Sequence, residues 1–199
     1  MSKKESEVGK MVKLGLILVC YAVASCTVLA IVNSFTSVRI KQNQIAAANK
    51  AMREVFSSAN EFVPVDSFAG STNSNIIISD FYEAKKDGQT IGAVVQISGP
   101  TYEKGKIILG LDINNKITGM QILELSDSPG FGLKANDPGF KVASGTTFYD
   151  QFTGKSGKLD FVVNQDFDGI SGATITSKAI GELVHEGCQS IMKTLGGKQ

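Results

Sequence analysis

The stretch IILGLDINNKITGMQIL, residues 107–123, decides the predicted fold. It holds two apolar runs, residues 107–113 and 117–123, on either side of the polar turn Asn114-Asn115-Lys116. Short runs rich in large and β-branched apolar residues that are joined by a polar turn are typical of β-hairpins. This stretch therefore predicts two adjacent antiparallel strands.

A second pair of apolar runs lies upstream and has the same pattern. Residues 76–82 and 90–97 flank Lys85-Lys86-Asp87-Gly88, and the glycine-containing stretch of residues 99–105 joins this pair to the first. A further strand is predicted at residues 159–163. Together these runs predict a mostly antiparallel sheet.

The C-terminal part of the chain predicts a helix. Apolar residues recur there with a helical period, at positions 179, 180, 183, 184, 187, 188, 191, 192 and 195. Strands followed by a helix predict an α+β fold. The chain has 199 residues, and the part beyond the N-terminal segments is large enough for a single hydrophobic core, so we predict one domain over residues 63–199.

Residues 14–32 form an uncharged apolar run of 19 residues near the N-terminus. A helix needs about 20 apolar residues to span a bilayer, so we predict a transmembrane helix over residues 13–33. Apolar residues at helical spacing between Lys41 and Ser57 predict a juxtamembrane helix. This helix belongs to a stalk of residues 34–62 that leads into the domain.

The charges around the apolar run predict its orientation. Four basic residues precede it and two follow it, namely Lys3, Lys4, Lys10 and Lys13, then Arg39 and Lys41. The side with more basic residues faces the cytoplasm, so residues 1–12 are predicted as a cytoplasmic tail and the domain as extracytoplasmic. The alternative is a lipoprotein cleaved before Cys26, but the apolar run continues beyond this cysteine, which favours an uncleaved anchor.

The residues Asp168-Gly169-Ile170-Ser171-Gly172-Ala173-Thr174 stand directly before the predicted C-terminal helix. Unpaired N–H groups and the positive end of the helix dipole would favour a phosphate there, and Thr176 or Ser177 could add a capping hydroxyl. The motif resembles the site at which a flavin transferase joins FMN, through its phosphate, to a threonine or serine in the Rnf and sodium-pumping quinone reductase families. The resemblance implies Thr174 as the acceptor, with Thr176 as the nearest rival. It also implies flavin contacts from Asp168, Gly169, Ser171, Gly172, Ala173 and Thr176.

A second segment, residues 126–134, reads Ser-Asp-Ser-Pro-Gly-Phe-Gly-Leu-Lys. Its glycines allow the backbone to approach a flat ligand closely. In the families just named, an equivalent loop reads Glu-Thr-Pro-Gly-Leu-Gly and lines the flavin. The resemblance therefore implies further flavin contacts from Ser128, Pro129, Gly130, Phe131, Gly132 and Lys134.

The resemblance covers nearly the whole chain and best matches the RnfG family of the Rnf complex, with the NqrC family of the sodium-translocating NADH:quinone reductase as the alternative. It implies an electron-transfer flavoprotein with one covalent FMN per chain, held in a bacterial or archaeal cell membrane. The implied partners are the other membrane and ferredoxin-like subunits of a complex that couples ferredoxin:NAD⁺ electron transfer to Na⁺ or H⁺ translocation, and the flavin transferase. Such a protein carries electrons for an oxidoreductase and needs no catalytic acid, base or nucleophile of its own. A stand-alone anchored flavin carrier and a cofactor-free anchored binding protein stay open as alternatives.

Composition argues against two other classes of function. The net charge is +1, and without a basic stripe the sequence does not favour nucleic acid as a partner. Cys20 and Cys26 lie in the apolar run, whereas Cys188 and His185 lie on the predicted C-terminal helix without ligand-type residues at suitable spacing. We therefore predict no metal site, and a buried structural role for Cys188.

Overall fold

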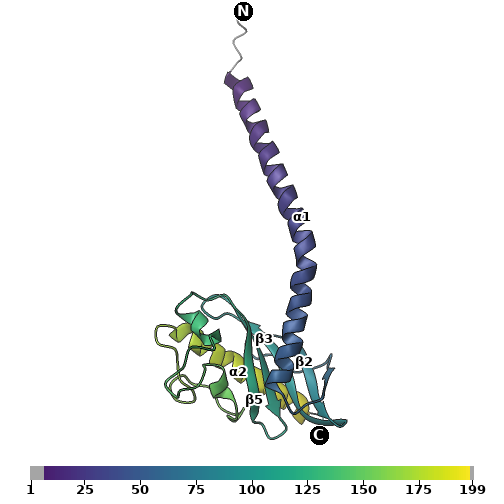
Figure 1. Cartoon of the computed structure of the whole chain (residues 1–199), viewed down its shortest axis with the longest axis vertical. Helices are drawn as coiled ribbons and strands as arrows, with labels where there is room; N and C mark the ends of the chain where they lie inside the picture. Colours follow the sequence, from purple (N-terminus) through teal and green to yellow (C-terminus); the bar gives the residue numbers. More distant parts are fainter. Residues whose placement is uncertain (1–6, 198–199) are drawn as a thin grey trace, which may run out of the picture. The chain divides into compact units, whose positions relative to one another are not determined.

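The computed structural model describes residues 7–197, and Figure 1 shows the helices and strands that they form. Residues 1–6 of the predicted cytoplasmic tail, residues 1–12, therefore lie outside the described residues. Contacts divide the chain into two units, with the division between Ala46 and Ala47. The first helix, α1 (Glu7–Val55), continues through this division.

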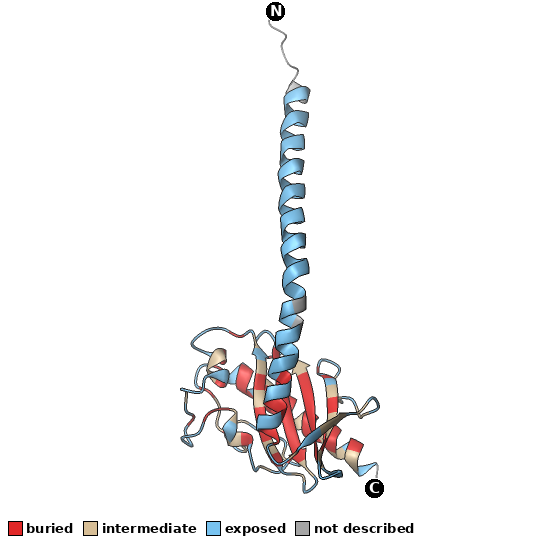
Figure 2. Cartoon of the chain, turned by 45° about the vertical axis from the view of Figure 1, so that its right-hand side comes forward, coloured by how far each residue is buried: buried red, intermediate tan, exposed pale blue. Residues whose placement is uncertain are grey.

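Between Met11 and Val32, α1 exposes its large apolar side chains. Leu14, Leu18 and Leu29 are 62%, 70% and 68% exposed, and Figure 2 shows this part of the helix as exposed almost throughout. Among residues 7–197, α1 is the helix that is long and apolar enough to cross a membrane. So large an apolar surface is unusual on a protein surrounded by water, and it fits a single-pass membrane anchor.

The second unit contains a five-stranded sheet in which the neighbouring strands run antiparallel. The strands lie in chain order: β1 (Glu61–Pro64), β2 (Ile77–Lys86), β3 (Gln89–Gly99), β4 (Gly105–Asp112) and β5 (Ile117–Leu125). The two predicted hairpins are confirmed as β2–β3 and β4–β5. The short strand β1 was not predicted, because its residues form no extended apolar run.

Helix α2 (Thr174–Gly196) covers one face of the sheet. Val95 of β3 pairs with Leu109 of β4, and both share a core with Leu183 and Val184 of α2. Figure 2 shows buried residues on the central strands and on the helix behind them. The predicted α+β fold with an antiparallel sheet is confirmed.

The last residues of α1 cover the other face. Val94 and Ile108 are each one position away from a residue of the first core, so their side chains point the opposite way and share a second core with Val55 and Phe56. At Gly119 an added Cβ would lie 3.0 Å from the carbonyl oxygen of Val55. The glycine therefore lets the end of the helix pack directly on the sheet backbone.

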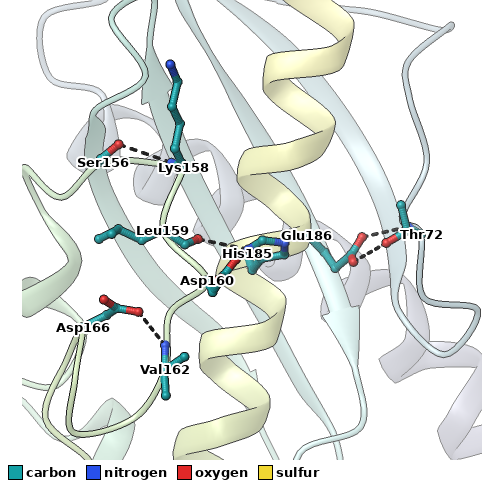
Figure 3. Close-up of polar contacts among 9 residues, drawn as sticks. All are labelled: Thr72, Ser156, Lys158, Leu159, Asp160, Val162, Asp166, His185 and Glu186. Atoms are coloured by element: carbon teal, nitrogen blue, oxygen red, sulfur yellow. Dashed lines mark hydrogen bonds and ion pairs between the residues drawn. The ribbon is translucent and has the colours of Figure 1, made fainter.

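The predicted strand at residues 159–163 is wrong. Phe161 has φ +55°, a left-handed conformation that a strand does not adopt. The N–H of Val162 donates to Asp166 Oδ2 at 2.8 Å, and the carbonyl of Leu159 lies 3.0 Å from Nδ1 of His185 on α2. The side chains of Asp166 and His185 therefore bind backbone groups that would otherwise pair with a neighbouring strand, as Figure 3 shows.

Candidate functional site: a cavity at the start of helix α2

Helix α2 begins at Thr174 without a side-chain cap. The residue before it, Ala173, has φ −132° and ψ 46° and makes no capping hydrogen bond. The first intrahelical bond runs from the N–H of Ser177 to the carbonyl of Ala173. Within the described part of the chain, the backbone N–H groups of Thr174, Ile175 and Thr176 have no acceptor. Unpaired N–H groups at the positive end of a helix dipole can donate to an anion.

The Thr174 side chain is exposed, and its hydroxyl has no hydrogen-bond partner among residues 7–197. It borders a cavity of about 420 Å³, which is within the range of small-molecule sites. The lining comes from the segments before β4, after β5 and around the start of α2: Tyr102, Asp127, Ser128, Phe131, Gly132, Gly172, Ala173, Thr174, Ile175 and Thr176. Six residues implied by the resemblance, besides Thr174, therefore meet here, namely Ser128, Phe131, Gly132, Gly172, Ala173 and Thr176.

Three large apolar side chains of this lining stay exposed. Tyr102, Phe131 and Ile175 are 62%, 57% and 58% exposed. They come from three different segments, and exposed apolar groups that gather at one cavity are typical of a binding site. Two aromatic rings and an aliphatic side chain suit a flat, largely apolar ring system.

Asp127 lies at the base of the cavity and is only 3% exposed. Its Oδ1 accepts hydrogen bonds from the hydroxyl of Thr101 at 2.5 Å and the N–H of Glu103 at 3.0 Å. Its Oδ2 accepts from the hydroxyl of Thr176 at 2.5 Å and the N–H of Tyr102 at 3.3 Å. Burial alone would raise the pKa of Asp127, but these four hydrogen bonds outweigh it and hold the pKa below its usual value.

Two glycines allow the segments to approach one another. At Gly132, an added Cβ would lie 2.6 Å from both Asp127 Cβ and Thr176 Oγ1, which no real Cβ tolerates. Gly172 has φ +80°, and a Cβ there would lie 3.2 Å from the Phe131 ring. Glycine is therefore required at both positions on steric grounds.

Thr176 and Ser177 do not cap the helix. Thr176 is 2% exposed and its hydroxyl is bonded to Asp127. The hydroxyl of Ser177 donates to the carbonyl of Ala173 and accepts from the N–H of Ile170. Both side chains hold the start of α2 in place, and the accessible hydroxyl at this end of the helix is that of Thr174.

Asp168 and Gly169 stand outside the cavity lining. Asp168 Oδ2 accepts the N–H of Ser144 at 2.7 Å, and the backbone of Asp168 forms two hydrogen bonds with the side chain of Gln151. The N–H of Gly169 donates to Asn164 Oδ1 at 3.0 Å. These hydrogen bonds hold Asp168 and Gly169 against the loops that contain Ser144, Gln151 and Asn164.

The remaining residues implied by the resemblance lie elsewhere. Ser171 is exposed and does not line the cavity. Pro129, Gly130 and Lys134 border a separate hollow of about 440 Å³, and the Lys134 ammonium lies 5.5 Å from the centre of the Phe140 ring. The structure thus divides the glycine-containing loop between two hollows.

Contacts on two sides of α2 hold the helix that presents Thr174. His185 faces Leu159, and Glu186 accepts hydrogen bonds from the N–H and the hydroxyl of Thr72 at 2.7 and 2.5 Å (Figure 3). Ser71 donates a further bond to Glu186. The helix is therefore hydrogen-bonded to the segments on both of its sides, which gives its first turn a stable position.

Cys188 is fully buried as predicted, and burial raises the pKa of its thiol to about 12.

Sequence reasoning missed three residues of the lining: Tyr102, Asp127 and Ile175. A signal existed for Asp127, since it stands where the related loop has glutamate. Tyr102 and Ile175 carry no such signal, because isolated apolar residues in a loop or at a helix start are common. Their exposure at one cavity is visible only in the folded chain.

Two family models match the chain. The model of the FMN-binding domain matches residues 103–189, and that of the RnfG N-terminal region matches residues 1–55. The first match includes most of the residues that line the cavity, and the second includes the whole of α1.

Curated relatives are similar over most of their length. The G subunit of a Na⁺-translocating ferredoxin:NAD⁺ oxidoreductase complex from Acetobacterium woodii is 32% identical, with 84% of this chain and 85% of that protein covered. The G subunit of a proton-translocating complex from Clostridium ljungdahlii is 26% identical over 86% of each chain. The G subunit of an ion-translocating oxidoreductase complex from Methanosarcina acetivorans is 25% identical, with 90% and 94% covered.

Proposed function

Because the chain belongs to the RnfG family of the ion-translocating ferredoxin:NAD⁺ oxidoreductase complexes, we propose that it holds one FMN, joined by a phosphoester to Thr174. The chain is an electron-transfer subunit of a membrane-bound oxidoreductase and contains an FMN-binding domain. The covalent bond, its position and the number of flavins are the new parts of the proposal. The match of the N-terminal region favours this complex over the related quinone reductase and over a stand-alone carrier.

The observation that carries the proposal is the free hydroxyl of Thr174 at an uncapped helix start. A phosphate on this oxygen would lie beside the unpaired N–H groups of residues 174–176, which can donate to it. Among the described residues that line the cavity there is no lysine or arginine, so no cationic side chain of this lining would pair with the phosphate. The chain would therefore bind the phosphate through its backbone and the helix dipole.

The cavity beside Thr174 suits the rest of the cofactor. Tyr102, Phe131 and Ile175 offer apolar contacts to an isoalloxazine ring. FMN supplies reversible electron transfer when it is bound, and the protein adjusts its potential through hydrogen bonds, burial and nearby charge. The carboxylate of Asp127 is the charged group of the lining, so it is the residue with the most direct electrostatic effect.

The proposal includes a topology. The excess of basic residues before the span supports a cytoplasmic N-terminus and a domain outside the cytoplasm. A covalent bond would keep the flavin on a domain that faces away from the cytoplasm. The partners would be the other membrane and ferredoxin-like subunits of the complex, and the flavin transferase while the protein matures.

The test is the intact mass of the chain produced with a flavin transferase, compared with the Thr174→Val variant. We expect the wild type to gain the mass of one FMN less one water, on the peptide that holds Thr174, and the variant to gain nothing while it unfolds at the same temperature. Thr153→Val, which changes an exposed threonine outside the cavity, is the matched control. A label on Thr176, or a label that persists in Thr174→Val, would refute Thr174 as the acceptor.

A further inference from the structure

Three segments that are distant in sequence surround the cavity, and all three converge on one carboxylate. Asp127 belongs to the segment after β5, Thr101 to Glu103 precede β4, and Thr176 belongs to α2. Each segment also presents one exposed apolar side chain at the cavity, namely Phe131, Tyr102 and Ile175. The relative positions of these three side chains therefore depend on the bonds to Asp127.

We propose that Asp127 is the positioning residue of the cavity, and that its bond to Thr176 sets the distance between the Phe131 loop and the start of α2. This rests on the proposed function, because the consequence is a fixed orientation for the ring of a flavin attached at Thr174. Asp127 acts through the segments that it joins.

Only one oxygen of Asp127 is hydrogen-bonded to α2. Oδ1 accepts hydrogen bonds from Thr101 and Glu103 in the segment before β4, whereas Oδ2 accepts the hydrogen bond from Thr176 of α2. Tyr102 donates its N–H to the same Oδ2 at 3.3 Å. Removal of the Thr176 hydroxyl therefore breaks the link to the helix and leaves the three other hydrogen bonds in place.

The atoms around the hydrogen bond between Asp127 and Thr176 are closely packed. Gly132 lies against both Asp127 and Thr176, at a distance that excludes a Cβ. The loop that holds Phe131 can thus reach its position only while the carboxylate and the threonine stay together. A simple surface hydrogen bond would not be enclosed in this way.

Glu186 provides a comparison within the same chain. It is also a buried acidic residue with hydrogen bonds from a loop, 6% exposed and bonded to Ser71 and Thr72. None of these residues lines the cavity. A change at Glu186 should therefore affect stability without affecting the cavity, and it separates a positioning role from a merely structural one.

The experiment compares Thr176→Val, Thr176→Ser and Glu186→Gln in the full chain. Amide hydrogen exchange of Phe131, Leu133 and Ser177, whose N–H groups donate to backbone carbonyls beside the cavity, is measured on the unmodified chain. Fluorescence anisotropy and iodide quenching of the flavin are measured on the labelled fraction. We expect Thr176→Val to speed exchange at these amides roughly tenfold, since one hydrogen bond to a charged group is lost. Its flavin should rotate more freely and be quenched more strongly, Thr176→Ser should restore both, and Glu186→Gln should leave the ring as in the wild type.

The proposal is overturned if Thr176→Val leaves exchange and flavin mobility at the wild-type level, or if Glu186→Gln changes the flavin equally. If Thr176→Val does not fold, Thr101→Val, which removes a donor on the opposite side of the carboxylate, tests the same role. Failure of the proposed function looks different, because the wild type itself would then carry no FMN. The exchange measurement on the unmodified chain would still decide whether Asp127 holds the cavity segments together.

Discussion

Asp127 and Asp168 are two acidic residues in the segments that matter most for this chain, and their surroundings differ sharply. Asp127 is buried and accepts four hydrogen bonds at the cavity. Asp168 is partly exposed, lies outside the cavity lining and accepts the N–H of Ser144. At the residue scale, Asp127 joins the segments around the cavity, and Asp168 joins the motif that precedes Thr174 to the loop of Ser144.

Asp168→Ala should reduce flavin attachment at Thr174. The loss of the bond to Ser144 costs about 1 kcal/mol, a factor of roughly five in the population of the ordered segment. Asp168→Asn should retain more of the label than the alanine variant, because its amide oxygen can still accept this N–H. The measurement is the labelled fraction by intact mass after a fixed time with the transferase.

The Asp168→Asn variant distinguishes two explanations for reduced flavin attachment at Thr174. If it is labelled as poorly as the alanine variant, the transferase reads the negative charge itself, and the bond to Ser144 is not the reason for the loss. Equal labelling of all three proteins would show that Asp168 has no part in the reaction.

At the scale of elements, α2 carries a polar row that sequence periodicity did not predict. Glu182, Glu186, Ser190 and Thr194 recur every four residues, which places them on one side of the helix. They bind the segment between β1 and β2: Glu182 accepts from Asn73, Glu186 from Ser71 and Thr72, Ser190 donates to Ala69, and Thr194 accepts from Ala69. The helix that presents Thr174 is therefore held by polar contacts as well as by its apolar side.

Glu186 should make the domain sensitive to acid. Burial alone raises its pKa, but the hydrogen bonds from Thr72 and Ser71 and the charge of His185 outweigh this, so the pKa is lowered from its ordinary value of 4.5. A lowered pKa means that the charged form is favoured in the folded state. Its stabilising contribution is complete above about pH 4.5 and is lost as the pH falls through the folded-state value.

Glu186→Gln should lower the free energy of unfolding by about 1–3 kcal/mol near neutral pH, since it disturbs a buried carboxylate that accepts three hydrogen bonds. The variant should also lose less stability than the wild type on acidification. Glu182→Gln is the control, because Glu182 is exposed and, in the described structure, binds only Asn73. This substitution should change the free energy of unfolding by only about 0.5 kcal/mol. Denaturant unfolding at a series of pH values measures the free energy of unfolding of the wild type and of both variants. If this free energy changes with pH in the same way in the wild type and in Glu186→Gln, the predicted role of Glu186 is contradicted.

At the scale of the whole molecule, the two units of the chain have different surfaces. Residues 11–32 of α1 expose a series of large apolar side chains, whereas residues 47–197 enclose cores on both faces of their sheet. Such a division fits an anchor that faces lipid and a domain that faces water.

The domain should be accessible from outside the cytoplasm. Protease added to spheroplasts should degrade residues 47–199, and inside-out vesicles should protect them. The reverse pattern would overturn the proposed topology. Intact mass of the same sample tests the alternative at the N-terminus, since a lipoprotein would begin at a lipidated Cys26 and lack residues 1–25.

Much of the fold could be predicted because its signals are local. The hairpin of residues 107–123 shows itself through two apolar runs and a polar turn, and α2 through its helical period. The strand predicted at residues 159–163 failed because Asp166 and His185 bind backbone groups of that segment, and these contacts come from other parts of the chain. Short apolar runs are ambiguous for this reason.

The sequence by itself determined the apolar run long enough to span a membrane, the antiparallel hairpins, the helix behind Thr174 and the family resemblance of the motif. Only the tertiary structure decided that Thr174 is accessible while Thr176 is buried, although the two lie on the same turn, because Asp127 accepts a bond from Thr176 across 49 positions of sequence. It also decided that Tyr102, Phe131 and Ile175 meet at one cavity. Periodicity and turn chemistry act between neighbours in sequence, whereas a binding cavity depends on contacts between residues that the folded backbone brings together.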